Sequence, residues 1–251
     1  MLDPTSPWTP FQPQRQWMRP LLETPAGRRY RVAVSLPDGP PPPDGWTSLT
    51  VLDGHRLFLA VAATASALAT RPEKTGVRPL AVIGVFHDET QGSVEDARAL
   101  DFTDTPCPEP DWTRPSGGAE AFRRFLVEQA WPAATQAAPL DGDRRALIGH
   151  SLGGLFVLET LARRPDLFAR WISLSPSLWW RTPAVDNADD RLLLGYGEGE
   201  TGRDMRRRIE AWAAEAGGEG HVPRLRMAAG ADHGSAPFAL IPETLRHASG
   251  A

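Results

Sequence analysis

The sequence has a single cysteine, Cys107, among its 251 residues. One cysteine excludes an internal disulfide bond and a zinc site built from several thiolates. Positive charge is not in excess either, since 27 Lys and Arg residues against 31 Asp and Glu residues give a formal net charge of −4. The basic surface that would hold DNA or RNA is therefore not predicted, and we expect no nucleic-acid partner.

Long apolar runs are also missing. The longest, residues 57–69, is alanine-rich, is interrupted by Thr64 and Ser66, and is too short to cross a bilayer. The N-terminal stretch MLDPTSPWTPFQPQRQWMRP carries prolines and polar residues where a secretory signal needs an unbroken apolar segment. These patterns predict a buried helix at residues 57–69, no membrane partner and a cytoplasmic location.

The sequence does have an alternation of strand and helix patterns. Strands are predicted at residues 30–36, 49–52, 79–86, 145–149, 169–174, 191–197 and 222–228. Helices are predicted at residues 56–70, 118–134, 152–164, 202–216 and 237–247. This order predicts an α/β fold with a mostly parallel twisted sheet and helices on both faces. Residues 1–27 are expected to form a proline-rich lead-in packed on a single domain of residues 28–251.

The segment Gly149-His150-Ser151-Leu152-Gly153 lies where a predicted strand changes into a predicted helix. This G-x-S-x-G pattern is typical of the nucleophile elbow, a sharp turn that presents a serine at the edge of a parallel sheet. The flanking glycines would avoid a collision of Cβ atoms in so tight a turn. The Leu152 backbone N–H would then face an oxyanion formed beside Ser151. The alternative is an ordinary glycine-rich turn.

A nucleophilic serine needs a base, and in this chain order the base follows the serine. Of the six histidines, His233 fits best, because it follows the strand at 222–228 in the loop Asp232-His233-Gly234-Ser235. His55 and His87 precede the serine, and His150 adjoins it with a side chain directed elsewhere. His221 opens a predicted strand, and His247 lies in a predicted helix. The alternative for His233 is a surface residue in a capping turn made by Asp232 or Ser235.

The acid that orients the histidine should follow the strand at residues 191–197. Glu198 is the first carboxylate there and is the favoured residue, with Glu200 as the next candidate and Asp204 after it. Exposed loop acids are ordinarily only solvated charges. A serine–histidine dyad without a strong acid partner therefore stays open.

The second oxyanion donor is expected in the loop after the strand at residues 79–86, on the premise that this strand neighbours the elbow strand. The backbone N–H groups of Phe86 and His87 are the candidates. The neighbouring run His87-Asp88-Glu89 has residue types that bind metals. Consecutive residues of an extended loop point in different directions, however, so no metal site is predicted.

Taken together, these segments resemble the enterochelin and salmochelin esterase group of the α/β-hydrolases, which is related to esterase D. The likeness covers most of residues 28–247 and keeps the order of the family. The matching segments are VLDGHRLF (51–58), AVIGVF (81–86), RALDFTDTP (98–106), GGAEAFRRFL (117–126), IGHSLGGLFVL (148–158), RPDLFARWISLSPSLWW (164–180), LLLGYGEGE (192–200) and DHGSAP (232–237).

The resemblance implies an α/β-hydrolase fold without a large cap domain, with Ser151 as nucleophile and His233 as base. The acyl-transfer chemistry expected of these residues requires no cofactor. The resemblance also implies that Arg98 lies near the acyl or catecholate pocket and that Trp179 and Trp180 lie close to the substrate. The alternatives are core packing for at least one tryptophan and pairing of Arg98 with Asp101 or Asp104.

The function that the sequence predicts is hydrolysis of carboxylic esters through an acyl-enzyme. The resemblance implies a small-molecule ester as partner, with ferric siderophores of the catecholate trilactone type as the expected class. A general short-chain or aryl carboxylesterase, a thioesterase and an acyltransferase would use the same residues. A non-catalytic binding protein on the same fold is a further alternative, although neither Ser151 nor His233 is missing. The oligomeric state is left open.

Overall fold

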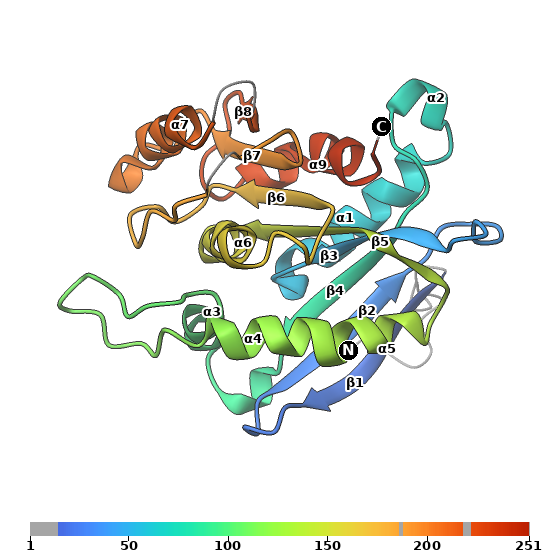
Figure 1. Ribbon diagram of the computed structural model, residues 1–251, viewed down its shortest axis with the longest axis horizontal. Helices are drawn as coiled ribbons and strands as arrows, with labels where there is room; N and C mark the ends of the chain where they lie inside the picture. The colour runs from blue at the N-terminus through green and yellow to red at the C-terminus, as the bar shows by residue number, and fades with distance from the viewer. Residues whose placement is uncertain (1–14, 186–187, 218–221, 251) are drawn as a thin grey trace, which may run out of the picture.

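A computed structural model describes residues 15–185, 188–217 and 222–250, and its centre is an eight-stranded sheet (Figure 1). The strands run in the order β1-β2-β4-β3-β5-β6-β7-β8. Strands β4, β3, β5, β6, β7 and β8 are mutually parallel, while β2 is antiparallel to both β1 and β4. This confirms the predicted mostly parallel α/β fold. The bounds are β1 Gln16–Glu23, β2 Arg29–Ser35, β3 Trp46–Val51, β4 Ala81–His87, β5 Leu140–His150, β6 Arg170–Leu174, β7 Leu192–Gly197 and β8 Arg224–Ala228.

The edge strand β1 lies within the predicted lead-in, residues 1–27. Residues 16–23 pair with β2, so the sheet starts before residue 28 and the expected domain boundary is corrected there. The pairing is irregular between Arg19 and Leu22, around Pro20. Proline has no N–H to donate and is tolerated in a strand only at such an edge, which explains why the segment does not look like a strand. Residues 1–14 of the lead-in lie outside the described residues.

Helices cover both faces of the sheet (Figure 1). The predicted helix at 118–134 is an α-helix, a π turn at Leu126–Ala130 and a second α-helix in direct succession. Helix α3, whose second half overlaps the RALDFTDTP segment, was not predicted. The bounds are α1 Gly54–Leu68, α2 Pro72–Thr75, α3 Val94–Asp101, α4 Ala119–Phe125, α5 Trp131–Thr135, α6 Leu152–Arg163, α7 Met205–Ala216, α8 Ala236–Ala239 and α9 Ile241–Ala248, with 3-10 turns at Glu89–Gln91 and Gly202–Asp204.

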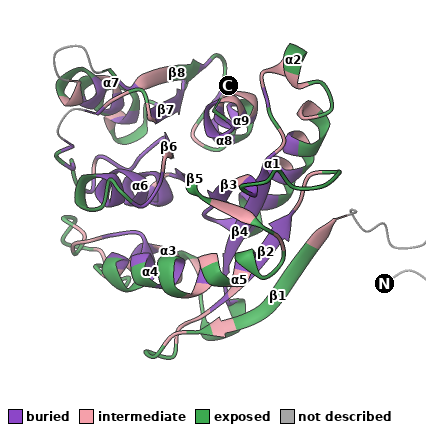
Figure 2. Ribbon diagram, turned by 45° about the vertical axis from the view of Figure 1, so that its right-hand side comes forward, coloured by how far each residue is buried: buried purple, intermediate pink, exposed green. Residues whose placement is uncertain are grey.

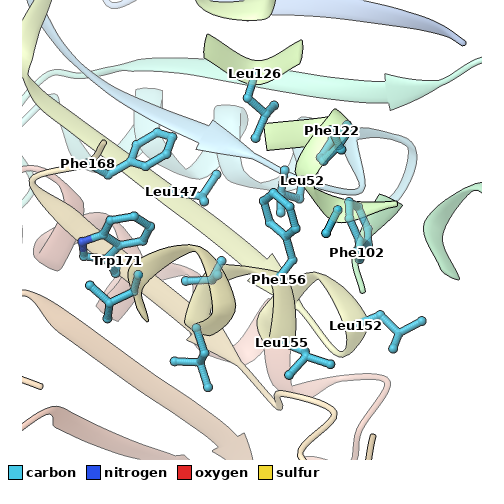
Figure 3. Packing of buried hydrophobic residues seen from close by; sticks show 14 of the residues in the cluster. Leu52, Phe102, Phe122, Leu126, Leu147, Leu152, Leu155, Phe156, Phe168 and Trp171 are labelled. Carbon is cyan, nitrogen blue, oxygen red and sulfur yellow. The ribbon is translucent and has the colours of Figure 1, made fainter. Parts of the chain in front are cut away.

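Strand alternation divides the buried side chains between the two faces. In β5, Leu147 joins the core under α4 and α6, whereas Ala146 and Ile148 join the core under α1 and α9. Figure 3 shows the first core, where Phe102, Phe122 and Phe156 pack together. Figure 2 shows the same arrangement as a buried centre, with β1 exposed at the margin. The elbow strand is therefore held from both sides.

Helix α1 contains most of the longest apolar run. Six of its residues are buried, among them Leu57, Phe58 and Val61, which face the sheet. The predicted buried helix is thus present. Among the residues that the structure describes, none of the helices combines the length and the apolar character needed to cross a membrane.

Candidate active site

Ser151 lies at the sharp turn between β5 and α6. Its backbone has φ 60° and ψ −116°, a positive φ that residues other than glycine rarely adopt. A Cβ atom on Gly149 would lie 2.1 Å from the carbonyl oxygen of Gly153, so glycine is required at 149. A Cβ atom on Gly153 would have its nearest neighbour at 3.5 Å, an ordinary contact. The predicted collision therefore exists at Gly149 and not at Gly153.

His233 lies in the loop after β8, on the same edge of the sheet as Ser151. Its Nε2 is 3.1 Å from Ser151 Oγ. The loop is fixed on both sides of the histidine, because Asp232 Oδ1 accepts the Ser235 N–H at 2.8 Å and Arg56 donates to the Gly234 carbonyl at 2.6 Å. The structure thus brings together the two side chains that the sequence paired, and it also contains the Asp232–Ser235 turn of the alternative.

The carboxylate beside His233 belongs to Glu200, and the preference for Glu198 is corrected. Glu200 Oε2 lies 3.2 Å from His233 Nδ1, while Glu198 Oε2 accepts the Gly230 N–H at 2.9 Å. The chain turns back directly after β7, since the Glu200 N–H donates to the Gly197 carbonyl at 3.2 Å. This tight turn carries the side chain of residue 200, and not of residue 198, under the edge of the sheet.

Glu200 is 3% exposed, and its other oxygen is also bonded. Oε1 accepts the Ser175 hydroxyl at 2.5 Å and the Gly197 N–H at 2.7 Å. Burial alone raises the pKa of this carboxyl, but the hydrogen bonds from His233, Ser175 and Gly197 outweigh it and hold the pKa below its ordinary value. Glu200 is therefore ionised near neutral pH. Because it accepts the Nδ1 proton, this network assigns the tautomer that leaves Nε2 free toward Ser151.

His150 was expected to point away from the site, and the structure corrects this. Its ring packs against His233, with the ring centroids 4.6 Å apart and the planes at 40°. The residue is 1% exposed, and within the described residues neither ring nitrogen has a hydrogen-bond partner. Burial, reinforced by the neighbouring His233 ring and by the charges of Arg56 and Arg98, lowers the pKa of His150 to about 2. A neutral ring therefore covers one face of His233.

The backbone N–H of Leu152 is the first candidate to hold an oxyanion. Leu152 is the first residue of α6, so its N–H has no acceptor within the helix. The N–H of Ser151 itself is engaged, because it donates to the Leu174 carbonyl at 3.0 Å. The predicted role of Leu152 is consistent with this geometry.

The second candidate donor is not at Phe86 or His87, and the sheet order gives the reason. Strand β3 lies between β4 and β5, so the carboxyl end of β4 is one strand too far from the elbow. The turn from β3 into α1 is adjacent instead. Its residue Asp53 has a carboxylate oxygen 3.5 Å from the position that a Cβ of Gly153 would occupy. The N–H groups that open α1, those of Gly54 and His55, have no acceptor within the helix.

The run from His87 to Glu89 sends its side chains to different places. His87 Nε2 is 3.1 Å from an Asp101 carboxylate oxygen. The Asp88 carboxylate pairs with the Arg29 guanidinium at 3.0 Å, and the Glu89 carboxylate lies 3.2 Å from the His55 ring. Each of these three side chains therefore has its own partner near the end of β4, and the three do not converge on one point.

A cavity of about 550 Å³ opens above Ser151. Its lining includes Arg98, Ser177, Trp179, Arg203 and Met205, together with the loop that carries His233. Ser177 Oγ lies 3.3 Å from Ser151 Oγ, so the nucleophile position has a second hydroxyl beside it. The site is open to solvent at the carboxyl edge of the sheet.

Arg98 lines this cavity, as the resemblance implied, but its guanidinium is bound to Asp53. Nε donates to Oδ1 at 2.5 Å and Nη2 to Oδ2 at 2.9 Å. The alternative partners are corrected, because Asp101 pairs with Arg28 and Asp104 pairs with Arg123. Arg98 therefore connects α3 to the β3–α1 turn.

The two tryptophans after β6 have different surroundings. Trp179 lines the cavity, and the guanidinium carbon of Arg203 lies 3.5 Å from its ring centroid. Trp180 is 4% exposed, and its Nε1 donates to the Thr105 carbonyl at 3.2 Å. Of the predicted pair, only Trp179 is placed to meet a ligand, and Trp180 belongs to the core.

Comparisons with known proteins agree with this fold. Residues 24–212 match the family model described as "Putative esterase". The ferri-bacillibactin esterase BesA of Bacillus subtilis is 37% identical over 174 residues, which are 66% of this chain and 60% of that relative. A siderophore triacetylfusarinine C esterase of Aspergillus fumigatus is 33% identical over 176 residues, or 65% of this chain and 56% of that relative. The chain thus spans a little more than half of the length of both.

Among solved structures, the BES protein from Bacillus cereus has the same fold. It superposes with a TM-score of 0.84 at 24% sequence identity, and the superposition covers 96% of this chain and 98% of that one. At this identity the likeness supports the arrangement of strands and helices.

Proposed function

Because the chain belongs to this esterase family of the α/β-hydrolases, we propose that it is a serine esterase that cleaves carboxylic esters through an acyl-enzyme on Ser151. One observation carries the proposal. Ser151 Oγ, the His233 ring and the Glu200 carboxylate are joined by contacts of 3.1 and 3.2 Å beside an open cavity. A serine hydroxyl becomes nucleophilic near neutral pH only when such a base and acid support it.

In the proposed reaction Ser151 Oγ attacks the ester carbonyl while His233 Nε2 takes the hydroxyl proton. Ionised Glu200 stabilises the imidazolium that results. Collapse of the tetrahedral intermediate breaks the carbonyl–alkoxy bond, and His233 returns the proton to the departing alcohol. A water molecule, deprotonated by His233, then attacks the acyl-enzyme and releases the carboxylic acid with free Ser151.

The negative charge that forms on the carbonyl oxygen needs fixed donors. We assign this role to the Leu152 N–H and to the N–H groups of Gly54 and His55, which open α1 after the β3–α1 turn. They follow the ends of two neighbouring parallel strands, β3 and β5, on the same edge of the sheet as Ser151. Donors fixed by the backbone do not have to reorient during the reaction, which is why such sites lower the barrier.

For the substrate we propose an ester of a siderophore. The names of the relatives support this class, and so does the cavity, which is wide and open to solvent. Trp179 with Arg203 stacked on its ring provides a flat and positively charged wall. Such a wall suits an aromatic acyl group that carries negative charge, as a catecholate does.

The esterase proposal is tested with p-nitrophenyl butyrate and a fluorophosphonate probe. Wild-type protein should hydrolyse the ester and be labelled on Ser151, and Ser151→Ala should lose both properties, with a fall in rate of about 10³-fold or more. Peptide mapping of the labelled protein identifies the serine. Labelling of another serine, or normal hydrolysis by Ser151→Ala, would refute the assignment.

The substrate proposal is tested separately by comparing two substrates on the same enzyme. We expect kcat/KM to be higher for a ferric catecholate trilactone than for p-nitrophenyl butyrate. Trp179→Ala should reduce the first of these values much more than the second, since the butyryl group has no ring and no charge to contact Trp179 and Arg203. A preference for the simple ester, with no effect of Trp179→Ala, would instead indicate a general short-chain carboxylesterase.

A further inference from the structure

The turn between β3 and α1 is held in an unusual backbone conformation. Asp53 has φ 56° and ψ 48°, the left-handed region, in which residues other than glycine are uncommon. Its side chain accepts no hydrogen bond from the first turn of α1, so it does not cap the helix in the ordinary way. Something other than capping must therefore keep the turn in place.

Arg98 supplies that constraint from α3. Its Nε and Nη2 bind the two carboxylate oxygens of Asp53 at 2.5 and 2.9 Å, a bidentate geometry that fixes both the distance and the plane of the carboxylate. The Asp53 side chain is 7% exposed and the Arg98 side chain 22% exposed, so water competes little for this pair. The ion pair thus determines where the carboxylate, and with it the turn, can lie.

The pair also lies against the nucleophile elbow. Asp53 Oδ2 is the nearest neighbour of the site where a Cβ of Gly153 would be, and Arg98 lines the cavity together with Ser151. Two of the three guanidinium nitrogens of Arg98 are occupied by Asp53. The Nε/Nη2 edge of the guanidinium is therefore already in use, and only Nη1 and the outer N–H of Nη2 remain for any other partner.

We propose that Arg98 is a positioning residue, which acts through Asp53 to hold the β3–α1 turn so that its free N–H groups face the oxyanion. This inference rests on the proposed esterase function and deepens it. It replaces the role implied by the family resemblance, in which Arg98 meets the acyl group. Loss of Arg98 lets the strained turn relax, and the transition state then loses a donor while substrate binding is little changed.

The test uses p-nitrophenyl acetate, whose acyl group has no charge and no ring for Arg98 to contact. Arg98→Gln is expected to lower kcat by about 10- to 100-fold with KM changed less than about twofold, because a misplaced oxyanion donor affects only the transition state. Arg98→Lys should fall between wild type and Arg98→Gln, since a lysine cannot form the bidentate pair.

Repeating the Arg98→Gln measurement in an Asp53→Gly variant distinguishes a positioning role of Arg98 from direct contact with the substrate. Glycine adopts the left-handed conformation without strain, so Asp53→Gly supplies a turn that needs no ion pair. In this background Arg98→Gln should change kcat by less than about threefold, because the two residues act as one unit. A full loss in both backgrounds, or a loss that appears in KM, would show that Arg98 contacts the substrate and would overturn the inference.

Two controls keep the outcomes distinct. Circular dichroism and thermal unfolding of each variant show whether the protein is folded, and Arg98→Lys serves if Arg98→Gln does not fold. Ser151→Ala is measured in parallel. If Ser151→Ala stays active, the esterase proposal fails, whereas an inactive Ser151→Ala beside a fully active Arg98→Gln overturns only the positioning role.

Discussion

The carboxylate of Glu200 lies 3.2 Å from Nδ1 of His233, on the side of the imidazole opposite Ser151. The same carboxylate is held by the Ser175 hydroxyl and the Gly197 N–H, so it is fixed before any substrate arrives. Glu198, two residues earlier in the same turn, bonds to Gly230 instead. The two glutamates form a matched pair for mutation, one joined to the histidine and one not.

Glu200→Gln should reduce kcat by about 10³- to 10⁴-fold, because the amide can favour the wrong tautomer of His233 and cannot stabilise its positive charge. Glu198→Gln should stay within about threefold of wild type, since it removes a charge from an exposed turn. Steady-state hydrolysis of p-nitrophenyl butyrate measures both. Equal effects of the two substitutions would remove Glu200 from the proposed mechanism.

The elbow offers a second matched pair. Gly149→Ala places a Cβ atom 2.1 Å from the Gly153 carbonyl oxygen and should destabilise the fold by about 3 kcal/mol or more. Gly153→Ala meets its nearest neighbour at 3.5 Å, so it should retain its stability and most of its activity. Urea unfolding of the two variants gives the free energies, and similar values would contradict the elbow geometry.

His150 should make the protein sensitive to acid. Its pKa is lowered to about 2 by burial and by the nearby positive charges, whereas in the unfolded chain it is near its ordinary value. The stability that the neutral ring contributes is therefore complete above pH 6.5 and is lost as the pH falls below that value. His150→Phe keeps an aromatic ring against His233. Between pH 6.5 and pH 5 its free energy of unfolding should fall by about 2 kcal/mol less than that of the wild type. Unfolding of both proteins across this range measures the difference, and parallel curves would contradict it.

Glu159 should act in the opposite direction. Burial, and then the negative charge of Asp104, raise the pKa of this carboxyl to about 7. The pKa of Glu159 is higher in the folded protein than in the unfolded chain. Its contribution to the free energy of unfolding is therefore fully present below about pH 4.5 and is lost as the pH rises to about 7. Glu159→Gln should therefore be more stable than wild type at pH 8, by about 1 to 3 kcal/mol, and nearly equal at pH 5. Thermal unfolding at the two pH values tests this, and a constant difference would count against it.

The parts of the site that the sequence predicted are those tied to the order of elements along the chain. Ser151 follows β5 and His233 follows β8, and parallel strands bring the ends that carry them to one edge of the sheet. Topology therefore predicts that both residues lie on this edge, and the loop after β8 carries His233 across the remaining strands to Ser151. The glycine at 149 follows from the same turn.

The parts that were missed depend on local geometry and on strand order. Whether Glu198 or Glu200 turns inward is decided by a single hydrogen bond in the turn after β7, for which the sequence has no periodic signal. The second oxyanion turn was placed after β4 because the insertion of β3 between β4 and β5 is not visible in a linear sequence. His150 packs against His233, which lies 83 residues later in the chain, and no local sequence pattern predicts a contact over this separation.

The separation of Ser151 from His233 by 82 positions has a consequence for biosynthesis. In the proposed mechanism the base is carried by the loop that follows β8, an outermost strand that is made after every other strand of the sheet. While the ribosome is still producing β8, the hydroxyl has emerged without its proton acceptor and is chemically inert. The proposed active site is therefore complete only when folding is nearly finished. A prematurely terminated chain would lack the base and would not form an acyl-enzyme with an ester.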